Sequence, residues 1–153
     1  MSRNLRMSEE QYAEKKKRGR APMVPIPTEH QEQAAFFKWW REYAPLKHIH
    51  VKLCFCIPNS SALSATGRLY KWNEGLTAGV SDIFLAIPKG GYHGLFIEMK
   101  RTGSYATADQ KEFSAAVSEK KYATALCYSS GEAIDKVQGY LSVELDYFTS
   151  TNP

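Results

Sequence analysis

The sequence predicts a single α/β domain with a central mixed β-sheet flanked by helices. Amphipathic helical patterns alternate with short apolar strand patterns along residues 28–141, an order that builds layered α/β folds. Two of the strand patterns are joined by a glycine-rich turn, which favours an antiparallel hairpin and therefore a sheet of mixed direction. The length of 153 residues is enough for one domain with its own core.

The composition narrows the class of protein. A chain that is 43% hydrophobic and 24% charged is typical of a soluble globular domain. No apolar run approaches the roughly 20 residues of a membrane span, and the N-terminus is polar, so we expect neither membrane association nor secretion. The three cysteines form no recognised disulfide framework, which is typical of a reducing compartment. We therefore expect a cytoplasmic protein.

Residues 1–27 are predicted to form a basic, flexible arm ahead of a domain at residues 28–153. Residues 1–25 hold seven bases against three acids, and so account for the whole net charge of +4. A basic cluster at residues 15–20 is followed by prolines at 22, 25 and 27, which disfavour helix and strand. Such an arm either follows the phosphates of a nucleic acid or aids solubility, and the sequence leaves both open.

The first predicted helix begins after Thr28 and runs to about Tyr43, before Pro45. Thr28 and the glutamine three residues later form a capping-box pattern, and apolar residues recur at helical spacing. Glu29 and Gln33 lie near one another at this spacing, so the first turn could present a carboxylate and an amide to the sheet. Taken alone, Glu29 is better explained as an acid favoured by the helix dipole.

The alternating pattern from His48 to Ile57 predicts a strand with two histidines and two cysteines on one face. This combination suggests a zinc site. However, a strand rises about 3.3 Å per residue, so His48 and Cys56 would lie roughly 26 Å apart. One zinc ion with bonds of about 2.0–2.3 Å cannot reach both. We interpret the thiols as small apolar side chains instead.

The polar segment from Pro58 to Trp72 is predicted to be a loop that interleaves basic and aromatic residues. Such a mixture suits DNA contact through phosphate pairing and stacking, and it equally suits a loop that only covers the domain. Under the first interpretation the residues that face DNA are Asn59, Ser60, Arg68 and Lys71.

Residues 79–100 predict the hairpin at the centre of the sheet. Residues 83–87 are all apolar, as expected of a strand covered on both faces, whereas residues 95–100 alternate. The intervening turn at residues 88–94 is rich in glycine. We expect a hairpin centred near Gly91.

This hairpin would place Asp82 opposite Lys100 and Phe84 opposite Glu98. Asp82 and Glu98 would then lie at the same end of the sheet, within one or two cross-strand spacings of about 5 Å. Two carboxylates and a lysine beside a core are unfavourable unless they pair or bind a metal. The alternative is that Lys100 forms a purely structural ion pair with Glu98 or Asp82.

The three charged residues have the chemistry of a metal-dependent hydrolase. Asp82 and Glu98 offer hard oxygen ligands for Mg²⁺ or Mn²⁺, and the main-chain carbonyl of Met99 could add another. Lys100 could orient a water molecule or offset charge on a phosphate. Glu29 could complete the metal site or hold a second metal ion if its helix packs beside the end of the strand.

Three further elements complete the predicted fold. A helix is expected from about residue 107 to 121, with Gln110 and Lys111 in its first turn, near the end of the Glu98 strand. A strand at residues 122–128 and a helix from Ser130 to about residue 141 follow.

From Glu29 to Leu141 the sequence resembles the VRR-NUC branch of the PD-(D/E)xK nuclease superfamily. The resembling stretches are Glu29-His-Gln-Glu-Gln33, Ile57-Pro-Asn-Ser, Glu74-Gly-Leu-Thr-Ala-Gly-Val-Ser-Asp82-Ile-Phe-Leu, Phe96-Ile-Glu-Met-Lys100, Gln110-Lys-Glu-Phe, and residues 122–141. The resemblance implies a restriction-endonuclease-like core and a metal-dependent DNA endonuclease. It implies catalytic roles for Glu29, Asp82, Glu98 and Lys100, and matches Gln33 to a polar position of the first helix. Ser81 stands where the superfamily name has Pro, and Met99 where Val is usual; neither side chain is a proposed ligand.

The resemblance also suggests a substrate. Small stand-alone members, typical of bacteria and phage, look like homodimeric Holliday junction resolvases, and this chain has their size. We expect a homodimer that acts on branched DNA, with Mg²⁺ or Mn²⁺ and no small-molecule cofactor. The alternatives are a flap or non-specific DNA nuclease, a DNA-binding module of the same fold without turnover, and an interaction protein with a structural ion pair.

Overall fold

The computed structural model describes residues 26–58 and 72–143. Within these ranges the elements are α2 (Glu29–Leu46), a 3₁₀ turn (Val51–Leu53), β1 (Cys54–Cys56), β2 (Ile83–Leu85), β3 (Leu95–Met99), α4 (Ala108–Glu119), β4 (Ala123–Cys127) and α5 (Ser130–Ser142). This order of helices and strands agrees with the order predicted from sequence. Residues 1–25 of the expected arm lie outside the described residues, as do Asn59, Ser60, Arg68 and Lys71.

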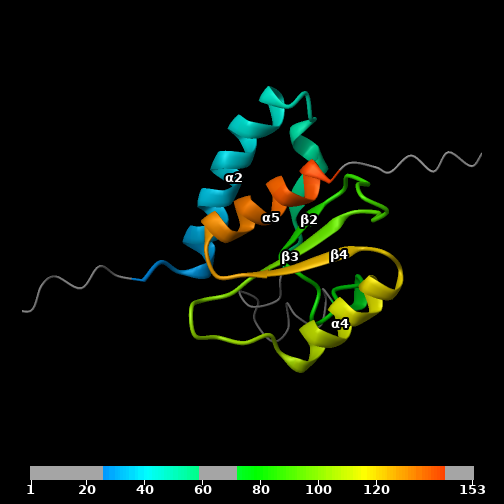
Figure 1. Cartoon of the computed structure of the whole chain (residues 1–153). Coiled ribbons are helices and arrows are strands. Elements are labelled where there is room, and N and C mark those ends of the chain that lie inside the picture. Colours follow the sequence, from blue (N-terminus) through cyan, green and yellow to red (C-terminus); the bar gives the residue numbers. More distant parts are fainter. Residues whose placement is uncertain (1–25, 59–71, 144–153) are drawn as a thin grey trace, which may run out of the picture.

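The described strands form one mixed sheet in the order β1-β2-β3-β4. The pairs β1–β2 and β2–β3 are antiparallel, whereas β3 and β4 are parallel. Helices α2 and α5 cover one face of the sheet, and α4 lies on the other (Figure 1). The predicted α/β class with a mixed sheet is confirmed. No helix in the described ranges has the length and apolarity that crossing a membrane requires.

The hydrophobic core lies between the sheet and the two helices α2 and α5. Phe36 and Trp40 of α2 are fully buried against alternate residues of β2 and β3. Trp40 donates its indole N–H to the Val51 carbonyl at 2.8 Å, and Tyr140 of α5 donates its hydroxyl to the Ile87 carbonyl at 2.7 Å. These bonds satisfy the polar atoms of two large aromatic side chains that would otherwise be buried without partners.

The hairpin register predicted from sequence is wrong by two residues. Ile83 pairs with Ile97 and Phe84 pairs with Phe96, so Glu98 does not face Phe84. The turn closes tightly at Lys89 and Tyr92 around two glycines with positive φ. More residues lie between Leu85, the last paired residue of β2, and Lys89 than between Tyr92 and Leu95, the first residue of β3. This difference shifts the register. One step beyond the Ile83–Ile97 pair, Asp82 comes opposite Glu98 instead of Lys100.

The predicted strand from His48 to Ile57 is also wrong over most of its length. His48 has a φ of 56°, which ends any extended backbone there. His50 then caps the 3₁₀ turn, because its Nδ1 accepts a hydrogen bond from the Lys52 N–H at 3.2 Å. Only the last part of the segment, Cys54–Cys56, pairs with β2. Local side-chain capping therefore overrides the alternating pattern.

Helix α2 is longer than the sequence suggested, because Pro45 lies within its last turn. A proline removes the hydrogen bond that its N–H would donate, and the helix ends one residue after Pro45. The other elements differ from their predicted bounds by at most two residues. β2 ends at Leu85, short of the predicted residue 87.

Candidate active site

Asp82 and Glu98 are held side by side by the register of the central hairpin. Asp82 immediately precedes β2, and Glu98 lies near the end of β3. The Asp82 carboxylate accepts a hydrogen bond from the main-chain N–H of Met99 at 2.8 Å, which ties the start of one strand to the end of the other. The side chain of Met99 itself is buried in the core.

Glu98 is the most buried charged residue that the structure describes, with 7% of its surface exposed. Its Oε1 atom lies 3.0 Å from the Lys100 ammonium and also accepts a hydrogen bond from the Gln110 amide of α4. Its Oε2 atom is buried and has no hydrogen-bond partner. A buried carboxylate oxygen without a partner is unfavourable, so Glu98 is poised for a further cation or donor.

The electrostatics of the site favour a proton on Glu98. Burial and the neighbouring Asp82 raise the pKa of Glu98 to about 7, although Lys100 acts in the opposite direction. Burial alone would lower the pKa of Lys100, but the ion pair with Glu98 and the charges of Glu29 and Asp82 outweigh it and raise that pKa. Lys100 is therefore a stable cation beside carboxylates that repel one another.

Glu29 reaches the same region from α2. It is the first residue of that helix, whose start is fixed by the capping box between Thr28 and Gln31. Its Oε1 atom accepts a hydrogen bond of 2.9 Å from the main-chain N–H of Arg101, just after Lys100. Glu29 thus anchors α2 to the chain that leaves β3.

The N-terminus of α4 is packed closely against the loop that leads to Asp82. Gly79 has a φ of +80°, and a Cβ atom at this position would lie 2.4 Å from main-chain atoms of Asp109. Only glycine fits there. The contact fixes the first turn of α4, and with it Gln110, beside Glu98.

These residues line one open cleft of about 550 Å³. The lining comes from α2, from the end of β1, from the loop before β2, from the end of β3 and from the start of α4. The lining residues are Glu29, His30, Gln33, Cys56, Ile57, Pro58, Thr77, Ala78, Gly79, Asp82, Glu98, Lys100, Thr107 and Gln110. Segments far apart in sequence are thus brought to one end of the sheet.

Most of the candidate residues that the structure describes gather in this cleft. Glu29, Gln33, Asp82, Glu98, Lys100 and Gln110 all line it. Lys111 instead lines a neighbouring groove on the α4 side of the sheet.

Sequence reasoning did not place His30, Cys56 or Thr77 at the candidate active site, although all three line the cleft. The position of His30 beside Glu29 was the one available signal. The patterns around Cys56 and Thr77 gave none, because their place depends on how the loops close.

The described side chains do not form a preorganised metal-coordination site. In the described ranges, no three His, Cys, Asp or Glu side chains converge as they would around one ion. Glu29 bonds to Arg101, Asp82 to Met99, and Glu98 to Lys100 and Gln110. What the site does offer is two adjacent carboxylates, one with a buried oxygen that has no partner.

The mixed sheet, the helices on both faces and the acidic cleft with its lysine define a nuclease-type α/β domain. The model of the VRR-NUC domain matches residues 19–131, and the chain therefore belongs to the VRR-NUC family, a family of nuclease domains. A solved structure described as a VRR_NUC domain protein is similar over 76% of this chain and 90% of its own, with 25% identity and a TM-score of 0.65. A search among curated proteins finds no match.

Proposed function

We propose that this protein is a Mg²⁺- or Mn²⁺-dependent endonuclease that hydrolyses phosphodiester bonds in branched DNA. The observation that carries the proposal is the unpartnered Oε2 atom of Glu98, buried beside Asp82 and within the cleft that also holds Lys100. Membership of a nuclease family supports DNA as the substrate.

The donor atoms suit a hard divalent cation. Mg²⁺ and Mn²⁺ prefer carboxylate and carbonyl oxygens, and they are often held by one or two carboxylates together with water and substrate phosphate. Asp82 and Glu98 would supply these carboxylates, with the Met99 main-chain carbonyl and Glu29 as further candidate ligands. The raised pKa of Glu98 is consistent with this role, because two adjacent carboxylates without a cation repel one another.

A bound cation supplies a polarised phosphate oxygen and a more acidic water molecule. The protein's own groups do the rest. Lys100 keeps its proton and places a positive charge where negative charge develops on the phosphate. Gln110 holds Glu98 by its Oε1 atom, which leaves Oε2 available to a further ligand. In the net reaction the oxygen of a water molecule forms a bond to phosphorus, and the bond between phosphorus and one sugar oxygen of the DNA breaks. One proton from the water passes to that leaving sugar oxygen.

We further propose that the active form is a homodimer and that its preferred substrate is a four-way junction. A four-way junction is nearly two-fold symmetric, and a symmetric dimer presents two matched sites to it. The predicted cytoplasmic location agrees with such a substrate. A flap or a non-specific nuclease would use the same cleft residues, so the substrate panel below decides between them.

The test is a cleavage panel with labelled four-way, flap, nicked and linear DNA, each with Mg²⁺, with Mn²⁺ and with EDTA. We expect the junction to be cut fastest and EDTA to abolish cleavage. Lys100→Ala should slow cleavage at least about 100-fold, as loss of a group that stabilises transition-state charge does. Lys120→Ala, an exposed lysine at the far end of α4, is the control and should cut normally.

If wild-type protein cuts none of these substrates with either metal, the nuclease proposal fails. If all four are cut equally, the enzyme is a nuclease but its junction preference is refuted. Metal-independent junction binding without cleavage would leave a DNA-binding module of this fold.

A further inference from the structure

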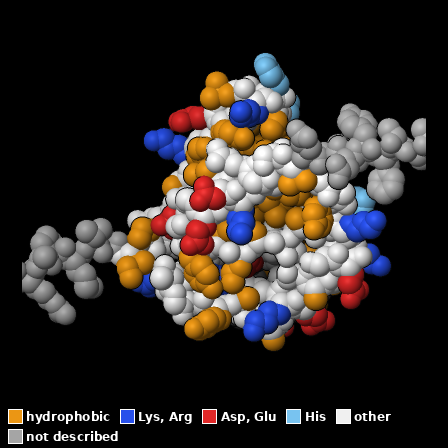
Figure 2. Space-filling view, in the orientation of Figure 1, with side chains coloured by type: hydrophobic (Ala, Val, Ile, Leu, Met, Phe, Trp, Pro, Cys, Tyr) orange, Lys and Arg blue, Asp and Glu red, His pale blue; other side chains and the backbone are white. Residues whose placement is uncertain are grey.

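A second groove lies on the α4 side of the sheet, next to the candidate active site. It has a volume of about 500 Å³ and runs between one side of α4 and the edge strand β4. The space-filling view shows a hollow between these two elements (Figure 2). The volume falls in the range of about 300–1,000 Å³ that is usual for small-molecule sites.

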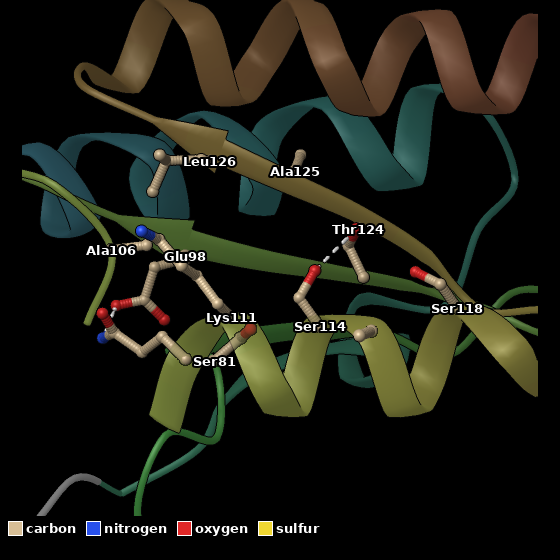
Figure 3. Close-up of a pocket in the computed structure, with 11 residues that line it drawn as sticks. Ser81, Glu98, Ala106, Lys111, Ser114, Ser118, Thr124, Ala125 and Leu126 are labelled. Atoms are coloured by element: carbon tan, nitrogen blue, oxygen red, sulfur yellow. Dashed lines mark hydrogen bonds between the residues drawn. The ribbon is translucent and has the colours of Figure 1, made fainter. Parts of the chain in front are cut away.

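The groove combines an apolar floor with free hydrogen-bonding capacity. Leu126 of β4 and Ala115 of α4 line the groove, and Leu126 is 37% exposed. The side chain of Ala125 points to the opposite face of the sheet, where it packs against the core. The Ser114 hydroxyl donates to the Thr124 hydroxyl oxygen at 3.1 Å, a bond that crosses the groove (Figure 3). Since each hydroxyl is both a donor and an acceptor, Thr124 keeps a proton to donate and Ser114 keeps lone pairs to accept.

The groove is continuous with the active-site cleft. Glu98 and Gln110 line both cavities, and the buried Oε2 atom of Glu98 lies at this junction without a partner. Lys111 extends from α4 toward the Glu98 end of the groove (Figure 3). The groove therefore offers the charge of Lys111 and the apolar side chain of Leu126 at its Glu98 end, and the hydroxyls of Ser114 and Thr124 farther away.

We propose that this groove binds an unpaired nucleotide of the DNA substrate, next to the phosphate that is cut. The base would lie against Leu126 and Ala115 with its polar edge toward Ser114 and Thr124, and the adjoining phosphate would pair with Lys111. The inference rests on the proposed nuclease function, and it gives that function a physical basis for selecting branched DNA. An unpaired nucleotide is available at a branch point, whereas an intact duplex must first be unstacked at a cost of a few kcal/mol.

The first test is equilibrium binding in EDTA with a matched pair of tryptophan variants. Ala115→Trp fills the groove, whereas Ala116→Trp makes the same change at an exposed position of α4 outside the groove. The probes are a fluorescent duplex and the same duplex with an unpaired loop of thymidines. We expect Ala115→Trp to weaken binding of the looped probe about tenfold or more, as loss of a base contact does. Ala116→Trp should bind both probes like the wild type, and duplex binding should change little in either variant.

If Ala115→Trp fails to fold, a matched pair of charge-reversal variants tests the same inference. Lys111→Glu and Lys120→Glu alter exposed lysines on the same helix, of which the first alone lines the groove. We expect the looped probe to lose affinity only with Lys111→Glu. Photocrosslinking of a single 5-iodouracil in the loop to wild-type protein should then label peptides of α4 and β4.

Equal binding by the two members of each pair would overturn the inference, even if the wild type cuts DNA well. Conversely, the wild type could cut no DNA while binding of the looped probe is lost only in the groove variants. That result would support the inference about the groove and refute the proposed nuclease activity. If Ala115→Trp changes the oligomeric state in light scattering and not loop binding, the groove is occupied by a second copy and the inference is wrong.

Discussion

The Asp82 carboxylate accepts a 2.8 Å hydrogen bond from the Met99 N–H, so the chain that enters β2 is fastened to the chain that leaves β3. The hairpin register places Asp82 opposite Glu98, the residue before Met99 on β3, and this contact lies beside that pair. The two carboxylates are close enough that Asp82 raises the pKa of Glu98. The hydrogen bond and the raised pKa both reflect the close approach of the start of β2 to the end of β3.

Asp82→Asn should abolish the response of the protein to Mn²⁺. A ligand at 100 times its dissociation constant stabilises a folded protein by about 2.7 kcal/mol, and wild-type Tm should rise accordingly. The variant should lose this rise and most of its cleavage. In EDTA it should be as stable as the wild type or more so, because carboxylate repulsion is relieved.

Thermal melts with and without Mn²⁺ measure both effects. Asp135→Asn, at an exposed position of α5, is the matched control and should respond to Mn²⁺ like the wild type. A wild-type protein indifferent to Mn²⁺, with an Asp82→Asn variant less stable in EDTA, would instead indicate a structural ion pair.

The stability of the metal-free protein should fall as the pH rises through the range in which Glu98 ionises. Burial and Asp82 raise the pKa of Glu98 to about 7, whereas an unfolded glutamate titrates near about 4.3. Between these values the folded state holds a proton that the unfolded state has released, so raising the pH favours unfolding. The contribution of protonated Glu98 to the folding stability is complete below the pKa of glutamate in the unfolded chain and is lost by about pH 7.

Urea denaturation between pH 4 and pH 8 in EDTA measures this slope. Glu98→Gln should flatten it, since the amide does not titrate, whereas Glu119→Gln at an exposed position should not. A slope that survives unchanged in Glu98→Gln would place the titrating group elsewhere.

Gln110→Ala should lower the turnover rate about tenfold, as a mispositioned catalytic group does. Its amide is the neutral donor that holds the Oε1 atom of Glu98, so its loss frees the carboxylate to rotate. Gln110→Glu should be more damaging, because it adds a negative charge beside Glu98. Single-turnover cleavage at saturating protein isolates the effect from DNA binding. Glu112→Ala, exposed on the same helix, should cut normally, and a Gln110→Ala enzyme of normal rate would exclude the positioning role.

Gly79→Ala should destabilise the fold more than Gly103→Ala. Both glycines have a φ near +80 to +90°, a conformation in which alanine costs about 1–2 kcal/mol. At Gly103 a Cβ atom meets nothing within 4 Å, so this strain is the whole effect. At Gly79 it would also collide with the main chain of Asp109, so α4 must shift. Denaturant melts compare the two, and equal losses would contradict the close packing.

Sequence by itself determined the order of elements, the α/β class and the residues at the heart of the site. The capping box at Thr28 is a local signal, because the side chain and the backbone groups that it satisfies lie within one turn. The charged residues around β2 and β3 could also be recognised from sequence, because ionised groups beside apolar runs are rare without a function.

Tertiary structure alone decided which of these residues meet. The register that sets Asp82 opposite Glu98 depends on a turn closure and an uneven number of residues that no periodic pattern encodes. The bond from Gln110 to Glu98 and the groove between α4 and β4 arise from packing between segments distant in sequence. Hydrophobic burial is non-directional, so it selects which faces turn inward, whereas register and helix placement are set by contacts that form only in the folded chain.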